Sequence, residues 1–216
     1  MKEEYIYALS KCLLFKGIES DKYDELLKKL KGKIRKYQKG EAIIHFEDEV
    51  IYAGIIIEGN VKGIFLNEDL DEINMSYFTI GDMFAEALSC ARSNSSPMEV
   101  SALTDTTILF VDLLANDSQD DILKIVNRNL IIDLASKNSF LNLKVRIVSQ
   151  KTLRDKIIMY LSSLPKDANG YHIMKYNQTA LASFLNANRS ALARELKRME
   201  DEGLIQRKAH NIKLFI

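Results

Sequence analysis

The 216-residue sequence has few of the residues that hold small folds together covalently or through metals. It contains two cysteines, two prolines and no tryptophan. Cys12 and Cys90 lie far apart with no paired spacing, which excludes an iron–sulfur cluster and a structural zinc site. Such scarcity of cysteine is typical of a reducing cytosol.

Long apolar runs are also missing. The N-terminal segment MKEEYIYALSK is too charged for a secretory signal peptide. Nowhere do about eighteen apolar residues follow one another, so no membrane span is expected. We therefore expect a cytoplasmic protein without a membrane partner.

The sequence shows none of the common catalytic patterns. It has no Ser/His/Asp constellation, no His-rich metal motif and no phosphate-binding loop. We expect no catalytic residue and no metal ligand, and therefore a protein that is not an enzyme.

The formal net charge is zero, but the charges are unevenly distributed. From Lys151 onward, 12 Lys/Arg stand against 6 Asp/Glu, whereas residues 1–150 carry 18 against 24. A basic C-terminal segment on an acidic body indicates a DNA-binding module attached to another domain.

Residues 177–215 have the proportions of a helix, a tight turn, a second helix and a small hairpin. The second helix carries Leu192, Leu196 and Met199 on one face. Its other face is basic, with small residues between the long ones: Arg189, Ser190, Ala193, Arg194 and Lys197. Such a face can lie in the major groove of DNA. The alternative is a solvated helix with a few basic residues.

Residues 33–112 are rich in short apolar runs separated by turn signals, which predicts an antiparallel sandwich or barrel. The expected strands are Ile34–Tyr37, Ala42–Phe46, Tyr52–Ile57, Val61–Leu66, Ile73–Phe78, Val100–Ala102 and Thr107–Val111. The segment Glu58–Asn60 predicts a tight hairpin between two of them.

Helical periodicity surrounds this region. Residues 3–30 read as helices, and residues 120–149 contain no glycine or proline, which predicts a helix of about 45 Å. That helix either packs on its own domain or pairs with a second copy of itself. A helix at Leu153–Leu164 and a short strand at Tyr171–Tyr176 follow. The predicted α+β chain has three parts, residues 1–118, 119–149 and 150–216.

This order of elements resembles the cyclic-AMP receptor protein/FNR (Crp/Fnr) superfamily of bacterial transcription regulators. The matching motifs are YQKGEAI at Tyr37–Ile43, YAGIIIEGNVK at Tyr52–Lys62, GDMFAE at Gly81–Glu86 and LKRMEDEGLI at Leu196–Ile205. The resemblance implies a cyclic-nucleotide-binding-like jelly roll, a long dimerisation helix and a C-terminal winged helix-turn-helix.

In nucleotide-binding members, the segment after G-D-x-F-G-E holds the cyclic phosphate, and its Glu holds the ribose. Glu86 is present here, but Ala85 replaces the Gly, and Ser96-Pro97 stands where an Arg-Ser pair would face the phosphate. We therefore expect a small-molecule effector other than cyclic AMP. Its candidate contacts are Phe84, Glu86, Leu88, Arg92, Ser95, Ser96 and Met98.

Two alternatives stay open for the barrel. In the first alternative, the pocket is vestigial and the switch is independent of a ligand. In the second, the barrel senses haem through Cys90. Arg92 is a possible substitute for the missing arginine. No resident cofactor is expected.

For DNA, the resemblance implies that Arg189, Ser190 and Arg194 meet base edges and that Asn188 caps their helix. Asn186 holds a turn position that requires a left-handed conformation. Residues expected at phosphates are Gln178, Thr179, Lys197, Arg207, Lys208 and Lys213. Ser190 replaces the family's usual Glu, so the operator should depart from the common half-site.

The implied partners are a palindromic operator with half-sites about 34 Å apart, a second copy of the chain and, for activation, RNA polymerase. The expected hinge between the domains is Ser149–Thr152.

Overall fold

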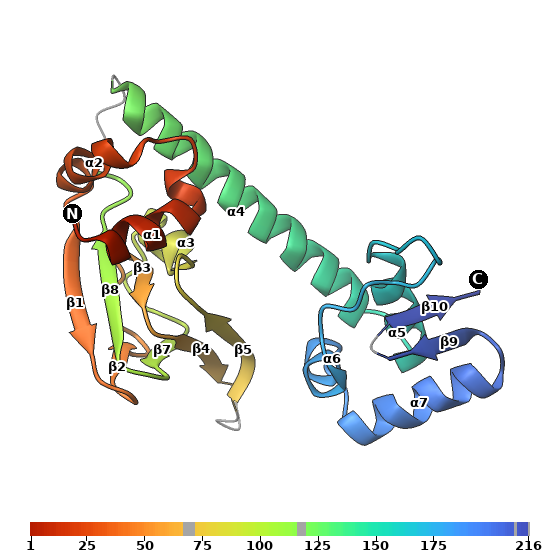
Figure 1. Cartoon of the computed structure of the whole chain (residues 1–216). Helices are drawn as coiled ribbons and strands as arrows, with labels where there is room; N and C mark the ends of the chain where they lie inside the picture. The colour runs from red at the N-terminus through yellow and green to blue at the C-terminus, as the bar shows by residue number, and fades with distance from the viewer. Residues whose placement is uncertain (67–71, 116–119, 210, 216) are drawn as a thin grey trace. The chain divides into compact units, whose positions relative to one another are not determined.

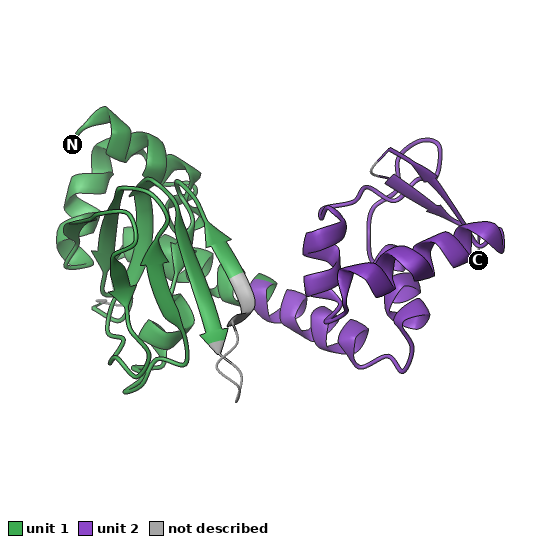
Figure 2. Cartoon of the chain, turned by 90° about the horizontal axis from the view of Figure 1, so that it is seen from below, with its two compact units in different colours: residues 1–136 green, residues 137–216 purple. Residues whose placement is uncertain are grey.

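The computed structural model divides into two compact units, residues 1–136 and 137–216 (Figure 2). The structure describes residues 1–66, 72–115, 120–209 and 211–215. Within these ranges, no helix is long and apolar enough to cross a lipid bilayer.

The first unit is built on two four-stranded antiparallel sheets, with the orders β1-β8-β3-β6 and β2-β7-β4-β5 (Figure 1). The strands are β1 (Lys33–Tyr37), β2 (Ala42–Ile44), β3 (Ala53–Glu58), β4 (Val61–Leu66), β5 (Glu72–Phe78), β6 (Met83–Phe84), β7 (Glu99–Ala102) and β8 (Thr106–Val111). The predicted barrel of an α+β fold is confirmed. The sequence pattern missed the two-residue strand β6.

Strand β3 separates the two cores of this unit. Ile56 packs with Phe84 and other residues between the two sheets. Ile55 and Ile57 pack on the opposite side, against residues of the helices such as Leu9. The helices on that side are α1 (Glu3–Lys11), α2 (Tyr23–Lys29) and the first part of α4 (Asp121–Val148). Because β3 is buried on both faces, its sequence is an almost unbroken apolar run.

The turn between β3 and β4 corrects the predicted hairpin. β3 pairs with β6 and β8, whereas β4 pairs with β5 and β7, so residues 58–60 carry the chain from one sheet to the other. Gly59 has a φ of +87°, and a Cβ there would lie 2.5 Å from the carbonyl oxygen of Asp105. Both the conformation and the close approach require glycine.

The long helix α4 begins after Asp120, whose carboxylate accepts hydrogen bonds from the Ile122 and Leu123 amides at 2.8 and 3.1 Å. Its 28 residues span about 42 Å. Leu123 belongs to the core of the first unit and Ile147 to that of the second, and the two units meet within the helix at residues 136/137. The predicted domain limit at 118/119 lies outside the described residues, and that at 149/150 stays a prediction.

The second unit has the helices and hairpin of the predicted winged helix-turn-helix. They are α5 (Leu153–Ser162), α6 (Gln178–Phe184), α7 (Arg189–Asp201), β9 (Ile205–Lys208) and β10 (Asn211–Leu214). Its core contains Leu181 of α6, Leu196 of α7 and Ile212 of β10. The strand expected at Tyr171–Tyr176 is wrong, because His172 forms isolated bridges with Lys166 and Ile212 instead.

Candidate nucleic-acid interface and barrel site

Three asparagines fix the start of α6 and the turn between α6 and α7. Asn177 caps α6, its Oδ1 accepting the Ala180 amide at 2.9 Å, and Gln178 and Thr179 are exposed in the turn that follows. Asn186 has a φ of 50°, which confirms the predicted left-handed residue of the turn.

Asn188 caps the recognition helix α7, as predicted. Its Oδ1 accepts the Ser190 amide at 2.9 Å and the Ser190 hydroxyl at 2.7 Å. The hydroxyl proton of Ser190 is thus used within the protein, and the lone pairs of its oxygen stay available.

Helix α7 buries one face and exposes the other. Leu192, Leu196 and Met199 are buried in the core of the second unit, as their spacing predicts. The opposite side holds an open depression of about 530 Å³, lined by Ala193, Arg194, Lys197, Arg198, Asp201 and Glu202. The depression therefore runs from the second turn of α7 to its C-terminal end, and its lining carries three cations and two carboxylates.

Ion pairs divide the cations of this surface into two groups. Lys197 pairs with Asp201 at 2.7 Å within the helix. By contrast, in the part of the chain that the structure describes, the exposed Arg189 and Arg194 form no side-chain hydrogen bond or ion pair. Of the three residues expected to read bases, the two arginines therefore keep guanidinium groups that have no partner among the described residues.

The cations on or next to the β9–β10 hairpin, the wing, also differ in whether their side chains already have a partner. Arg207 of β9 donates from Nε and Nη2 to Glu200 Oε2 at 3.1 and 2.6 Å, and this bond holds the pKa of Glu200 below its usual value. Lys213 donates to the Asn169 carbonyl at 3.1 Å. Lys208 is exposed with no such partner among the described residues. The phosphate contact expected of Arg207 would have to compete with Glu200.

In the barrel, Glu86 begins the short helix α3 (Glu86–Cys90) and is only 6% exposed. Ala85, immediately before it, has a φ of 58°. This left-handed conformation is accessible to glycine at low cost and costs alanine roughly 1 kcal/mol. Ala85 thus holds a conformation that suits a glycine better than an alanine.

The structure brings some of the expected effector contacts together between the sheets. Phe84 is buried, with its ring 5.8 Å from that of Phe78, in a cluster that also contains Met98 and Leu88. The Ser96 hydroxyl donates to the Met98 carbonyl at 2.7 Å. The surroundings of this group are therefore largely apolar.

Ser95 and Arg92 lie apart from that cluster. Ser95 is exposed. Arg92 donates to Asp112 at 2.7 Å and to the Ile51 carbonyl at 3.0 Å, so its guanidinium ties the loop after α3 to neighbouring strands. A phosphate contact by Arg92 would have to compete with Asp112, and the substitution of Arg92 for the missing phosphate-binding arginine stays a prediction. Asp112, its partner, was not found from the sequence, because the two residues are 20 positions apart without any periodic relation.

Cys90 lies partly buried beside the core on the helix side of β3. Burial raises the pKa of its thiol above the usual value. Across the described residues, no cluster of three His, Cys, Asp or Glu side chains is placed to hold a metal ion.

Comparisons with known proteins agree with this architecture. Residues 34–117 match the model of the cyclic nucleotide-binding domain, and residues 155–215 match that of the Crp-like helix-turn-helix domain. No curated protein sequence matches the chain.

Solved structures show the same fold at low sequence identity. The catabolite activator protein of Thermus thermophilus is 18% identical, with 94% of this chain and 93% of that chain covered at a TM-score of 0.54. The c-di-GMP responsive global regulator CLP of Xanthomonas campestris is 16% identical, with 92% and 100% covered at 0.59. DNR of Pseudomonas aeruginosa is 16% identical, with 100% and 96% covered at 0.50. The two domain matches show that the chain is a transcription regulator of the Crp/Fnr superfamily, and not an enzyme.

Proposed function

We propose that the chain is a homodimeric regulator that reads a palindromic operator through Arg189, Ser190 and Arg194. The observation that carries this proposal is the pair of free guanidinium groups on the exposed face of α7. A free guanidinium can bond both the O6 and the N7 of a guanine. Phosphate contacts are assigned to Gln178, Thr179 and Lys208. Lys197 and Arg207, which pair with carboxylates, and Lys213, which donates to the Asn169 carbonyl, are assigned weaker phosphate contacts.

Ser190 supports an operator that departs from the family's common half-site. Its hydroxyl donates to Asn188, so towards a base it can act as an acceptor, for the amino group of cytosine or adenine. The family's Glu is also an acceptor, but it reaches further. A serine at this position therefore relaxes or changes the base preference there.

Dimerisation is proposed through α4. Ile131 and Val145 are 66% and 59% exposed, and they lie fourteen residues, or two heptads, apart on this helix. Leu141 and Ile132 are also exposed. A second α4 would remove this apolar stripe from water, and a dimer would present two α7 helices to half-sites about 34 Å apart.

The effector is proposed to be a small molecule other than a cyclic nucleotide. Ser96 and Pro97 offer no cation to a phosphate, and Arg92 is held by Asp112. An unpaired phosphate in a partly buried site is costly. A switch independent of any ligand is the alternative, favoured by the burial of Phe84 and Met98 between the sheets. RNA polymerase is a further proposed partner, for activation.

Selection of binding sites from random DNA by the purified full chain tests the proposal. We expect a two-fold symmetric consensus sequence and a mobility shift caused by a dimer. In solution the wild-type chain should have the mass of a dimer, and the double variant Ile131→Glu, Val145→Glu should have the mass of a monomer. Failure to enrich any sequence, even at low salt, would overturn the reading of α7. Thermal shifts with cyclic AMP, cyclic GMP and cyclic di-GMP test the effector, and we expect none.

A further inference from the structure

The recognition helix α7, taken together with its C-cap residue Glu202, is electrically neutral. Residues 189–202 contain four basic and four acidic side chains. A neutral helix gains little from general attraction to phosphates. The positions of its carboxylates therefore determine which charged groups the helix presents to DNA.

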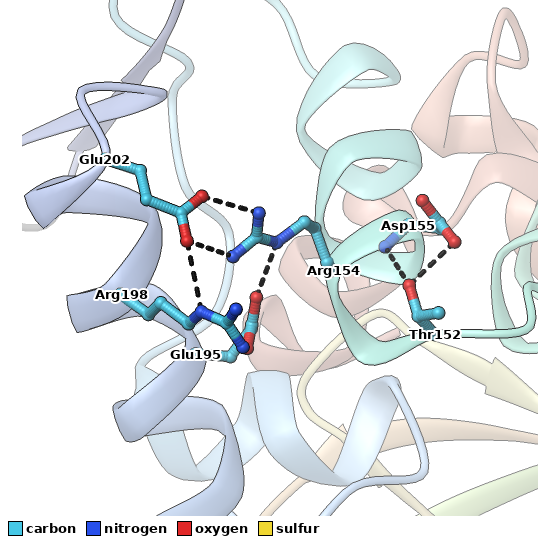
Figure 3. A network of polar contacts seen from close by, with 6 residues as sticks. All are labelled: Thr152, Arg154, Asp155, Glu195, Arg198 and Glu202. Atoms are coloured by element: carbon cyan, nitrogen blue, oxygen red, sulfur yellow. Dashed lines mark hydrogen bonds and ion pairs between the residues drawn. The ribbon is translucent and has the colours of Figure 1, made fainter.

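Each of the four carboxylates is held by a cation. Asp201 pairs with Lys197 and Glu200 with Arg207, at 2.7 and 2.6 Å. Glu195 and Glu202 are both held by Arg154 of α5, and Figure 3 shows the arrangement. Nε of Arg154 donates to Glu195 at 2.6 Å, while Nη1 and Nη2 donate to the two oxygens of Glu202 at 2.6 and 3.1 Å.

Arg154 differs from the cations that α7 supplies for itself. Lys197 and Arg198 pair within the helix, at i and i+4, so they cannot fix it to a neighbour. Glu195 and Glu202 lie seven residues apart, about two turns along one flank of α7. One guanidinium that bonds both resists rotation of α7 about its axis and sliding along α5.

We propose that Arg154 is a positioning residue that sets the orientation of the DNA-reading face of α7. The proposal rests on the reading roles proposed for Arg189 and Arg194. A rotation of about 10° moves an atom about 6 Å from the helix axis by roughly 1 Å. Hydrogen bonds to base edges hold only within a range of about half an ångström, so such a rotation breaks bidentate readout while phosphate contacts can readjust.

The same residue follows the expected hinge directly. Thr152 caps α5, its Oγ1 accepting the Asp155 amide at 3.1 Å, and Arg154 lies two residues later (Figure 3). Arg154 thus connects the start of α5, next to residues 149–152, to α7 through polar contacts, in addition to the core that the two helices share.

The experiment compares Arg154→Lys with Arg198→Lys in the full chain. Both changes keep the charge and remove a guanidinium that contacts Glu202, but only the first removes the link between α5 and α7. We expect Arg154→Lys to lower the ratio of operator to random-DNA affinity about tenfold, with random-DNA affinity near wild type. Arg198→Lys should leave the ratio unchanged. Thermal unfolding checks that both variants are folded.

Hydrogen exchange of the free protein gives a second readout that needs no DNA. Arg154→Lys should speed exchange of the α7 amides, and Arg198→Lys should not. An unchanged ratio and unchanged α7 exchange in Arg154→Lys would overturn the positioning role, as would equal effects of the two variants. If the wild type selects no DNA sequence, the reading roles fail, and the exchange data still decide whether Arg154 fixes α7.

Discussion

Replacing Arg194 by alanine separates base reading from general attraction to DNA. The Arg194 side chain is exposed, and within the described residues it has no intramolecular hydrogen bond or ion pair to lose. Its removal should therefore change binding more than folding. A bidentate contact to guanine gives about 1–3 kcal/mol of discrimination, which is roughly a 5- to 150-fold loss of affinity for each half-site of the operator.

Lys208→Ala is the matched change on the wing, because Lys208 is also exposed and unpaired among the described residues. A lysine that neutralises one phosphate contributes about 0.9 to the slope of log affinity against log salt. We expect this variant to lose affinity for operator and random DNA alike and to have a shallower slope. Arg194→Ala should keep its affinity for random DNA and lose preference at one base position.

Fluorescence anisotropy on labelled operator and random duplexes, at several salt concentrations between about 50 and 200 mM, measures all these quantities together. The assignment of roles is refuted if both variants lose the same affinity on both DNAs. A loss of base preference in Lys208→Ala but not in Arg194→Ala would reverse the two roles.

Three further predictions concern stability. Burial lowers the pKa of His172, so its contribution to stability is present above about pH 6.5 and is lost as the pH falls. Thermal unfolding of His172→Gln should therefore depend less on pH between about 7.5 and 5.5 than that of the wild type or of the exposed-site control His45→Gln. Ala85→Gly should stabilise the barrel by about 0.5 kcal/mol, whereas the control Ala87→Gly, inside α3, should destabilise it. If denaturant unfolding shows that both variants change the free energy of unfolding in the same direction, the strain at Ala85 is contradicted. Gly54→Ala should destabilise by about 1–3 kcal/mol, because its Cβ would lie 2.2 Å from the Phe84 ring, and unchanged unfolding would show that the ring can move.

Patterns local in sequence allowed most of the fold to be predicted. Short apolar runs separated by turn signals identified seven barrel strands. The absence of glycine and proline identified α4, and the spacing of Leu192, Leu196 and Met199 identified the buried face of α7. The caps at Asn177 and Asn188 act within three residues of their partners, so they too leave a mark in the sequence. The pairing of β3 does not, because an apolar strand fits any apolar neighbour.

The side-chain partners of the site were harder to predict, for a related reason. The pair of Lys197 and Asp201 follows from i, i+4 spacing. Arg154 is separated from Glu195 by 41 residues and Arg92 from Asp112 by 20, and no periodicity links such positions. Whether an arginine is free to meet a ligand therefore depended on the fold.

The difference between cations that are paired with carboxylates and arginines that are free gives the neutral recognition helix a physical rationale. Affinity for random DNA grows with the number of cations that can neutralise phosphates, whereas specificity depends on a few groups at base edges. Here Lys197, Arg198 and Arg207 are paired with carboxylates, while Arg189 and Arg194 are free. Pairing the first group reduces attraction to all sequences alike and leaves the base contacts of the second unchanged. A regulator built in this way gives up total affinity but keeps the difference in affinity between its operator and other DNA, and that difference decides which sites it occupies in a genome.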